Sequence, residues 1–323
     1  MFAKIFPDPL VPILLLILLT ASLFPAQGAG VPIADMISTL AFILLFFMNG
    51  VRLPRQEVLQ GLRNIRLQGS IFLFCFGAMA IAGWLTQQAS APWLPPTVAL
   101  GFLYLGILPS TVQSATAASS LAGGNVAASV VAAGILNIAA VLISPFLFAV
   151  AAGSEGAIQT DGVMRIISIL LLPFVAGQLC QKWLRPWALA NKRIVTYMDR
   201  TTICIAVYVA FSAAVVAGIW DQLQGQELAI VGAGVMLLML FAFYGAWLLG
   251  KKLGLPRPDR ISMLFACGQK SIAFGAPLAA TLFDPATAGM VLVPILIYHT
   301  VQLIISAWIA PLLAQRAGQF SAV

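Results

Sequence analysis

Residues 259–283 read DRISMLFACGQKSIAFGAPLAATLF. The stretch is apolar enough for a membrane helix, but Gly268-Gln269-Lys270-Ser271 interrupts it near the middle and Pro277 follows. A bilayer core of about 30 Å is crossed by roughly 20 apolar residues of helix, so the stretch has the length of a membrane span. Glycine lowers the cost of unwinding, and proline removes a backbone donor and clashes with the preceding turn. We therefore predict a membrane-spanning helix that is broken halfway.

The chain around this stretch is equally apolar. Of its 323 residues, 61% are hydrophobic and 8% are charged, whereas soluble domains carry roughly 25% charged residues. Because no soluble domain interrupts the apolar runs, we predict an all-α polytopic membrane protein with a single transmembrane domain, 1–323. The runs long enough for a span number about ten. They lie at 9–26, 31–51, 67–87, 93–121, 125–152, 162–183, 198–219, 227–250, 259–283 and 286–314.

The basic residues collect in alternate polar breaks. With the N-terminus inside, all of the 17 Lys and Arg residues except Arg165 and Lys270 fall on the cytoplasmic side or at the span ends beside it. This bias is the positive-inside rule, and it predicts that both termini are cytoplasmic. The formal net charge of +7 is therefore explained by topology, and we expect no nucleic-acid partner. The cytoplasmic set is Lys4, Arg52, Arg55, Arg63, Arg66, Lys182, Arg185, Lys192, Arg193, Arg200, Lys251, Lys252, Arg257, Arg260 and Arg316.

The predicted spans divide into five and five, joined by the external loop 153–161. An odd number in each half makes the second half enter from the opposite side, which gives an inverted repeat with halves 1–155 and 160–323. The fourth run of the first half is also interrupted, because Pro109 lies mid-run and polar residues follow it. Unsatisfied backbone groups are costly in hydrocarbon, so two broken helices at equivalent places indicate a polar site near the bilayer midplane. Kinks that serve only helix packing are the alternative.

The first run has a second interpretation. Lys4, the apolar residues 10–24 and the small residues 26–29 resemble a secretory signal peptide. Cleavage would leave an odd number of spans and break the repeat, so we expect the segment to be retained.

Lys270 is the most informative residue of the predicted site. An ammonium at the bilayer centre costs roughly 2.5–3.5 kcal/mol on insertion scales, so it needs an anionic partner, a water-filled cavity or deprotonation. Its depth in the span disfavours the alternative of a lysine that reaches the interface. The acidic residues map to loops or span ends, so an unpaired positive site suits either an anionic substrate or a proton-releasing lysine. They are Asp8, Asp35, Glu57, Glu155, Asp161, Asp199, Asp221, Glu227, Asp259 and Asp284.

Polar residues around the two breaks complete the candidate substrate and ion site. For Ser129 on the following helix, hydrogen bonding between helices is an equal alternative. For His299, a structural role is at least as plausible as a proton relay. The substrate- and ion-binding candidates are Ser110, Thr111, Gln113, Ser114, Asn125, Ser129, Gln269, Lys270 and Ser271, and the possible relay is His299 with Gln302.

Other chemistry has little support in the sequence. The four cysteines, Cys75, Cys180, Cys204 and Cys267, are isolated, and with a single histidine we expect no transition-metal site. No nucleophile–base pair, phosphate-binding glycine loop or catalytic motif stands out, so we do not expect an enzyme and expect no organic cofactor.

These motifs resemble those of a known family. Residues 108–115 (LPSTVQSA) and 124–130 (GNVAASV) resemble the fourth and fifth helices of bile acid:sodium symporters, and Gly268-Gln269-Lys270-Ser271 with Gly275 resembles the ninth. Residues 49–53 (NGVRL) resemble the turn after the second helix, and the likeness is closest to the bacterial SBF-like branch. The resemblance implies a panel domain of spans 1, 2, 6 and 7 beside a core domain of spans 3–5 and 8–10. In the core, the broken helices 4 and 9 would cross.

The chain departs from the symporters at their sodium ligands. Where the ninth-helix motif of the family has a sodium-ligating glutamate, this sequence has Phe265, and a ligating threonine of the fifth helix aligns with Ala133 although Ser129 is retained. The fourth-helix asparagine falls near Ala115 or Thr116, and the third-helix glutamine has no clear counterpart near Phe74 and Cys75. A lysine ammonium could occupy the space and charge of the lost sodium ion.

The sequence therefore predicts a secondary transporter in the cell inner membrane that moves a small organic anion by alternating access. Coupling to protons, or a lysine in place of sodium, is favoured over ordinary two-sodium symport. The first alternative is a sodium-coupled symporter of bile-acid-like or other organic acids, in which sodium would be the one bound ion. The second, of another class, is a transport-inactive membrane protein that affects ion homeostasis.

Overall fold

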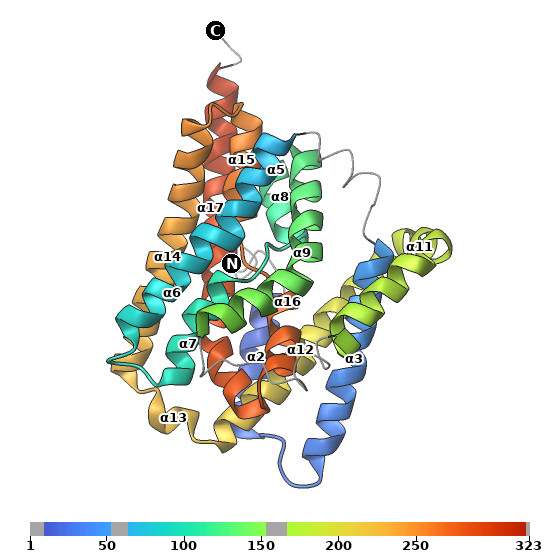
Figure 1. The fold of residues 1–323 in the computed structure, drawn as a ribbon, viewed down its shortest axis with the longest axis vertical. Helices are drawn as coiled ribbons and strands as arrows, with labels where there is room; N and C mark the ends of the chain where they lie inside the picture. The colour runs from blue at the N-terminus through green and yellow to red at the C-terminus, as the bar shows by residue number, and fades with distance from the viewer. Residues whose placement is uncertain (1–9, 53–63, 153–166, 321–323) are drawn as a thin grey trace.

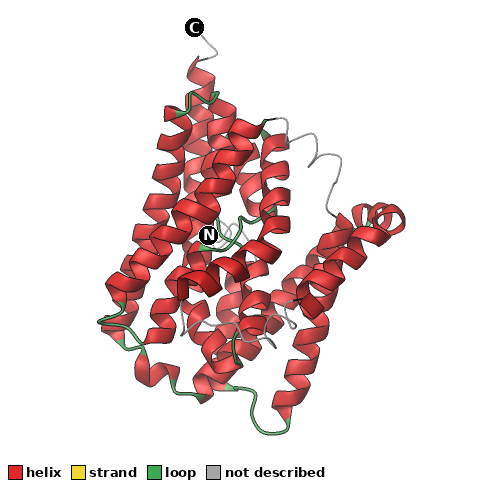
Figure 2. Cartoon of the chain, viewed as in Figure 1, coloured by secondary structure: helices red, strands yellow, loops and turns green. Residues whose placement is uncertain are grey.

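The computed structural model describes residues 10–52, 64–152 and 167–320, and every regular element in these ranges is a helix (Figure 2). Two short π-helical turns, η1 and η3, continue directly into α6 and α11. In chain order the elements are α2 (Leu10–Leu23), α3 (Gly30–Arg52), α5 (Ile65–Leu73), η1 (Phe74–Ala78), α6 (Met79–Ser90), α7 (Pro96–Gly106), α8 (Gln113–Leu121), α9 (Val126–Ala152), η3 (Ile167–Leu171), α11 (Leu172–Ala190), α12 (Lys192–Val216), α13 (Ile219–Gln222), α14 (Gly225–Lys252), α15 (Arg257–Gly268), α16 (Ile272–Leu282) and α17 (Pro285–Phe320).

A helix lies in every apolar run that the sequence identifies, and two of the runs are broken where expected. The run 93–121 forms α7 and α8, and the run 259–283 forms α15 and α16. Within the described ranges, seven continuous helical stretches are long and apolar enough to cross a membrane, and α2 and α7 are shorter apolar helices. The seven are Gly30–Arg52, Ile65–Ser90, Val126–Ala151, Ile167–Ala190, Lys192–Val216, Gly225–Lys252 and Pro285–Ala314.

The helices pack as two groups (Figure 1). The panel group, as we name it, consists of α2, α3, α11 and α12, with α3 lying along α11 and α12 against both α2 and α3. The core group consists of α5 to α9 and α14 to α17, in which α7 packs on α6 and α17, and α15 packs on α14 and α8. The contacts of α12 with α16 and α17 join the groups.

Hydrogen bonds show that the two broken helices cross within the core group. The hydroxyl of Tyr104 on α7 donates to the carbonyl of Gly275 on α16 at 2.6 Å. On the other side of the breaks, the hydroxyls of Ser119 on α8 and Ser262 on α15 lie 3.0 Å apart. The first half of each broken helix therefore pairs with the second half of the other.

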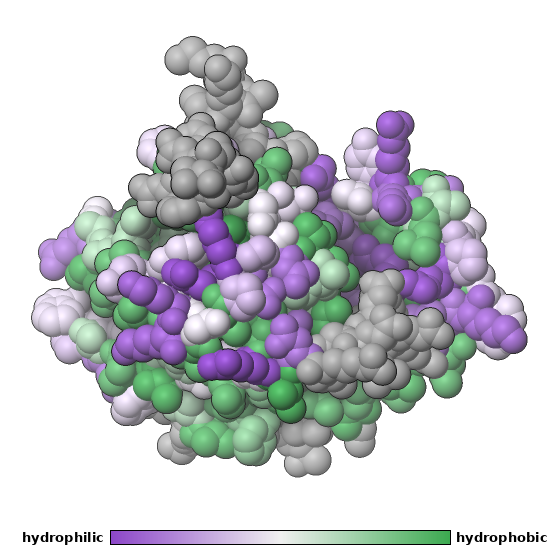
Figure 3. Space-filling model, turned by 90° about the horizontal axis from the view of Figure 1, so that it is seen from above, coloured by the Kyte–Doolittle hydropathy of each residue, from purple (hydrophilic) through white to green (hydrophobic). Residues whose placement is uncertain are grey.

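The outer surface has the character that lipid contact requires. Large apolar side chains such as Leu23, Leu179 and Trp308 are exposed, and such a quantity of exposed apolar surface is unusual for a soluble monomer. Hydrophilic side chains gather at the end of the molecule where α3, α14 and α17 finish (Figure 3).

Two helix boundaries differ from the sequence prediction. The helix that begins with η3 runs on to Ala190, so Arg185 lies within α11 and not in a polar break. Helix α12 begins at Lys192, so Asp199 lies two turns inside a helix and not at its edge. Hydropathy places a boundary where apolar residues end, whereas these helices continue into their polar flanks. The predicted loop 153–161, together with Lys4, Arg55, Arg63 and Arg165, lies outside the described residues.

Paired glycines bring α6 and α7 into backbone contact. A Cβ atom added at Gly83 would lie 2.5 Å from the Phe102 carbonyl oxygen and 3.0 Å from the Gly106 Cα. One added at Gly106 would lie 2.5 Å from the carbonyl oxygen of Met79. Small residues that allow such close approach are the usual means by which membrane helices associate. The contact also fixes the end of α7, where the first break begins.

We predict that Gly83→Ala destabilises the protein, because the new methyl group overlaps the α7 backbone, which has no flexible atom to displace. The expected loss is about 1–3 kcal/mol, typical of overpacking, and is measured as a lower midpoint of thermal unfolding followed by tryptophan fluorescence in detergent. Gly69→Ala is the matched control, since a Cβ there meets nothing within 4 Å. Equal midpoints for the two variants would contradict the packing argument.

Candidate functional site

The first break leaves five consecutive carbonyl groups without helical partners, and each is satisfied from outside. The ammonium of Lys270 donates to the carbonyls of Gly106 at 2.9 Å and Leu108 at 2.7 Å. Of the other three carbonyls, Ile107 O accepts from Ser144 Oγ at 2.7 Å and Pro109 O accepts from Ser271 N at 2.9 Å. Ser110 O accepts from Asn137 Nδ2 at 3.0 Å. An unwound segment is stable in an apolar interior only with such partners.

The second break is held by one side-chain amide. Gln302 on α17 accepts from the Lys270 backbone N–H at 2.7 Å and donates to the Lys270 carbonyl at 3.0 Å, as a neighbouring strand would. The Gln302 amide also contacts Nδ1 of His299 at 2.8 Å. Tyr298 donates its hydroxyl to the carbonyl of Gly268 at 2.8 Å, which satisfies the end of α15. Because Ser271 N donates to Pro109 O, the two breaks are also joined backbone to backbone.

Lys270 has no solvent exposure, and its ammonium is fully coordinated by backbone. Besides Gly106 and Leu108, it donates to the carbonyl of Cys75 in η1 at a longer 3.4 Å. An ammonium has three donors, so these three carbonyls match its capacity. Two of them lie at the C-terminal end of α7, where the helix dipole is negative and favours a cation. The charge is thus stabilised by oriented carbonyl dipoles, a kind of partner that was not among those expected from the sequence.

Gln269 links the two breaks through side chains. Its Oε1 accepts from Thr111 Oγ1 at 2.6 Å and from Ser114 Oγ at 2.5 Å, and its Nε2 donates to Ser306 Oγ on α17 at 3.0 Å. Thr111 Oγ1 also accepts from the N–H of Ala115, which caps the first turn of α8. The polar residues of both breaks therefore form one connected network around a buried amide.

A cavity of about 250 Å³ lies between the panel group and the core group. On the core side it reaches the N-terminal ends of both second half-helices, with Gln113 and Ser114 of α8 and Ser271 and Ile272 of α16. Helix N-termini carry a partial positive charge and free N–H groups that attract anions. Lys270 does not line the cavity, because its ammonium is engaged within the core group.

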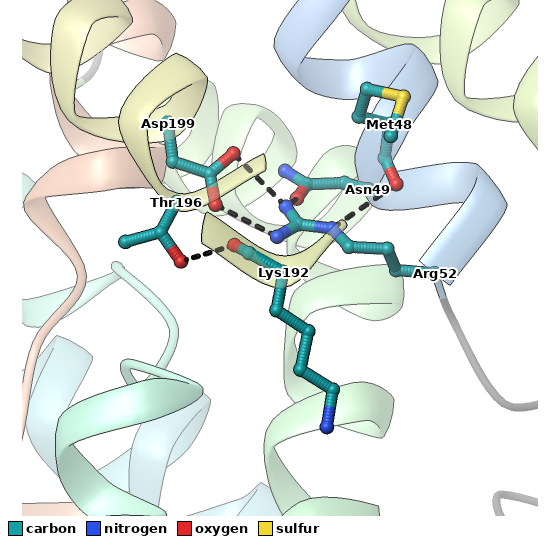
Figure 4. Close-up of polar contacts among 6 residues, drawn as sticks. All are labelled: Met48, Asn49, Arg52, Lys192, Thr196 and Asp199. Carbon is teal, nitrogen blue, oxygen red and sulfur yellow. Dashed lines mark hydrogen bonds and ion pairs between the residues drawn. The ribbon is translucent and has the colours of Figure 1, made fainter. Parts of the chain in front are cut away.

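The panel wall of the cavity carries an ion pair that the sequence did not reveal (Figure 4). Arg52, the last residue of α3, binds Asp199 of α12 through both terminal nitrogens, at 2.8 and 3.1 Å. Its remaining contacts are to Asn49 Oδ1 at 2.5 Å and to the carbonyl of Met48 through Nε at 3.3 Å. The fork-to-fork geometry fixes the guanidinium more strictly than a single contact would. Thr196 and Arg200, on α12, line the same wall.

The predicted site residues fall into three sets. Thr111, Gln113, Ser114, Ser271 and His299 line the cavity. A second set lies behind this surface, in the contacts between the breaks and α17, and consists of Ser110, Gln269, Lys270 and Gln302.

Asn125 and Ser129 form the third set, away from the cavity. The side chain of Asn125 caps α9 by accepting from Ala128 N at 3.0 Å and also donates to Asp259 at 2.8 Å. Ser129 is buried. The bonds of Asn125 are those of a helix cap, whereas the buried Ser129 Oγ has no hydrogen-bond partner among the described residues.

Two of the positions at which the resemblance implies a sodium ligand carry apolar side chains, Phe265 and Ala133. Phe265 is fully buried and packs edge-on against Phe243, and Ala133 is buried as well. Within the described ranges no three His, Cys, Asp or Glu side chains are grouped closely enough to hold a metal ion. The carbonyl oxygens of Gly106 and Leu108, at the end of α7, hold the Lys270 ammonium.

Comparison with known proteins places these features in a family. The model of the SBF-like CPA transporter family matches residues 8–315. A protein named "Putative symporter YfeH" from Escherichia coli (strain K12) is 37% identical over 98% of this chain and 95% of its own length. "Uncharacterized protein PA2026" from Pseudomonas aeruginosa is 32% identical over 99% and 96% of the two chains. "Sodium/bile acid cotransporter 7" from Mus musculus is 22% identical over 90% and 88%.

We predict that Gln302→Ala lowers stability through the second break, because both the N–H and the carbonyl of Lys270 lose their partner. An unsatisfied buried polar group costs roughly 1–3 kcal/mol, so the combined loss for the two groups should be about 2–6 kcal/mol, read from the unfolding midpoint in a detergent titration. Gln222→Ala on the exposed helix α13 is the control and should leave the midpoint unchanged. An unchanged midpoint for Gln302→Ala would contradict its role as the partner of the break.

Proposed function

Since this chain belongs to the SBF-like CPA transporter family, we propose that it is a secondary transporter that moves a small organic anion across the cell inner membrane by alternating access. The observation that carries the proposal is the cavity between the two helix groups. Its core wall is formed by the N-terminal ends of two half-helices, and in transporters such ends commonly face anionic substrate groups. A protein with only a structural role would gain nothing from two broken helices facing a cavity.

We further propose that ten helices cross the membrane as two inverted halves of five, with both termini in the cytoplasm. The helices at all ten apolar runs support the count if α2 and each broken pair are taken as one crossing. The gathering of hydrophilic side chains at the end where α3, α14 and α17 finish supports the orientation, because basic residues favour the cytoplasmic side (Figure 3). The panel group would then move against the core group as largely rigid bodies.

The Lys270 ammonium stands, in this proposal, in the place of a coupling sodium ion. A sodium ion would be held by oxygen atoms, and at the end of α7 the carbonyl oxygens of Gly106 and Leu108 already hold the ammonium. The sequence left two roles open for Lys270, a direct counter-ion of the substrate and a fixed or proton-carrying cation. Its position behind the cavity wall supports the second role.

One alternative function is sodium-coupled symport of an organic acid. It is favoured by the name of the mouse relative, which includes both sodium and bile acid. The buried phenyl ring at Phe265, where the symporter family has its carboxylate, argues against ordinary two-sodium symport.

A thermal-shift experiment separates the two modes of coupling. Purified protein is heated with aliphatic, aromatic and steroidal carboxylates and sulfonates, in sodium medium and in choline medium. Ligand binding to the folded state raises the unfolding midpoint, and we expect at least one anion to raise it by the same amount in both media. A shift that requires sodium would favour the alternative, and no shift with any anion would contradict organic-anion transport.

We predict that Lys270→Ala loses stability and becomes responsive to small cations. Without the ammonium, the Gly106 and Leu108 carbonyls lack a donor, at a cost of roughly 1–3 kcal/mol for each group. A small cation such as sodium or methylammonium can take the vacated place, whereas choline is too large. The unfolding midpoint of Lys270→Ala should therefore rise in sodium or methylammonium relative to choline medium, while the wild type and the exposed control Lys251→Ala should not respond.

One result would exclude the fixed-cation role of Lys270. In it, Lys270→Ala has the unfolding midpoint of the wild type, and in choline medium an organic anion raises that midpoint as much as it does in the wild type.

A further inference from the structure

We propose that the Arg52–Asp199 pair sets the charge of the transported solute, so that the cavity accepts organic monoanions with an apolar body and Asp199 excludes dianions. The inference rests on the proposed function and adds to it the substrate class and a specificity-determining residue. It follows from the position of Lys270, because a cation that is engaged inside the core group cannot serve as counter-ion in the cavity.

Among the described residues, the charged side chains that line the cavity lie on the panel group, and they are Arg52, Asp199 and Arg200. Arg52 and Asp199 form an ion pair. The two half-helix N-termini on the opposite wall add partial positive charge. A single anionic group of the solute is therefore attracted to both walls. A second anionic group would be repelled by the Asp199 carboxylate.

The bidentate geometry keeps the Asp199 carboxylate in the cavity wall. Both of its oxygens accept from Arg52, and the side chain retains 15% of its exposure while that of Arg52 retains 26%. The Lys192 ammonium, one helix turn away from Thr196, points away from the pair in Figure 4 and does not compensate the carboxylate. Arg52 thus remains partly exposed to an anion in the cavity, although Asp199 already balances its charge.

The remaining walls define the body of the solute. Leu45, Phe174 and Ile203 line the panel side, and Ile138, Ile272 and Phe274 line the core side. Mostly apolar walls with a few placed polar groups are typical of sites for amphipathic small molecules. A second carboxylate at the far end of such a solute would lose its water against apolar side chains or approach Asp199.

The test compares two acids that share a six-carbon chain but differ in charge, hexanoate and adipate. Their affinities are measured by thermal shift on the purified full-length protein, with phenylacetate and 1,4-phenylenediacetate as an aromatic pair. We expect the wild type to bind the monoanion at least tenfold more tightly than the dianion in each pair. Asp199→Asn should raise the relative affinity for adipate by about tenfold, because it removes one unit of repulsive charge in a partly screened cavity.

Three variants control the charge argument. Asp199→Glu keeps the charge and should keep the preference for monoanions. Asp221→Asn removes a carboxylate from the exposed helix α13 and should change nothing. Arg52→Gln should weaken hexanoate binding by about tenfold or more. Combining Arg52→Gln with Asp199→Asn restores the net charge of the wall and should partly recover hexanoate binding.

The outcomes separate this inference from the proposed function. If the wild type binds adipate as well as hexanoate, or if Asp199→Asn binds them in the wild-type ratio, the role of Asp199 is wrong while anion transport stands. If neither monoanion stabilises the wild type, monoanion binding fails and the proposed function fails with it. If Asp199→Asn does not fold, the hexanoate-to-adipate affinity ratios of the wild type and of Asp199→Glu still test the role of Asp199.

Discussion

The crossing of the two broken helices depends on one constraint, which is that every freed backbone group must find a partner in an interior that offers little water. Five carbonyls in a row, from Gly106 to Ser110, meet this constraint through donors from two segments, the second break and α9. Lys270 supplies two of these bonds, and its own peptide group is held by Gln302. Because each break supplies partners for the other, neither could persist alone, and the two half-helix ends are thereby fixed where the cavity lies.

This arrangement divides the electrostatic roles between the two helix groups. The core group contains a cation that is neutralised by dipoles and hidden from the cavity, whereas the panel group presents the ionised side chains that a solute would meet. The close approach of α6 and α7 at Gly83 and Gly106 connects packing to this division, since it positions a carbonyl that Lys270 needs. The packing of α6 on α7, the hydrogen bonds of the broken backbone and the position of the buried cation therefore depend on the same residues, Gly106 and Lys270.

The sequence predicted the helices and both breaks, because hydropathy, proline and glycine are local signals, and it singled out Lys270 as an isolated charge. It also placed Thr111, Gln113, Ser114 and Ser271 at the cavity. It could not predict that Lys270 is held by carbonyl groups, because every residue has a backbone carbonyl and the sequence does not show which ones face the ammonium. The pairing of Arg52 with Asp199 was missed because each looked like a charge at a helix edge, and nothing in the sequence joins residues 147 positions apart. Asn125 was assigned to the site by its polarity, although its bonds serve the start of α9.

A cation that belongs to a side chain differs from a bound ion in one respect. Its effective concentration at the three carbonyls is set by the length of the tether and not by the composition of either aqueous phase. In the proposed transporter, the order of the crossing would then not depend on a sodium gradient, and the protein without solute would be as well assembled as the protein with solute. A protein built in this way would keep its core intact when salt is scarce, at the expense of the energy that a dissociating ion could contribute to uphill movement.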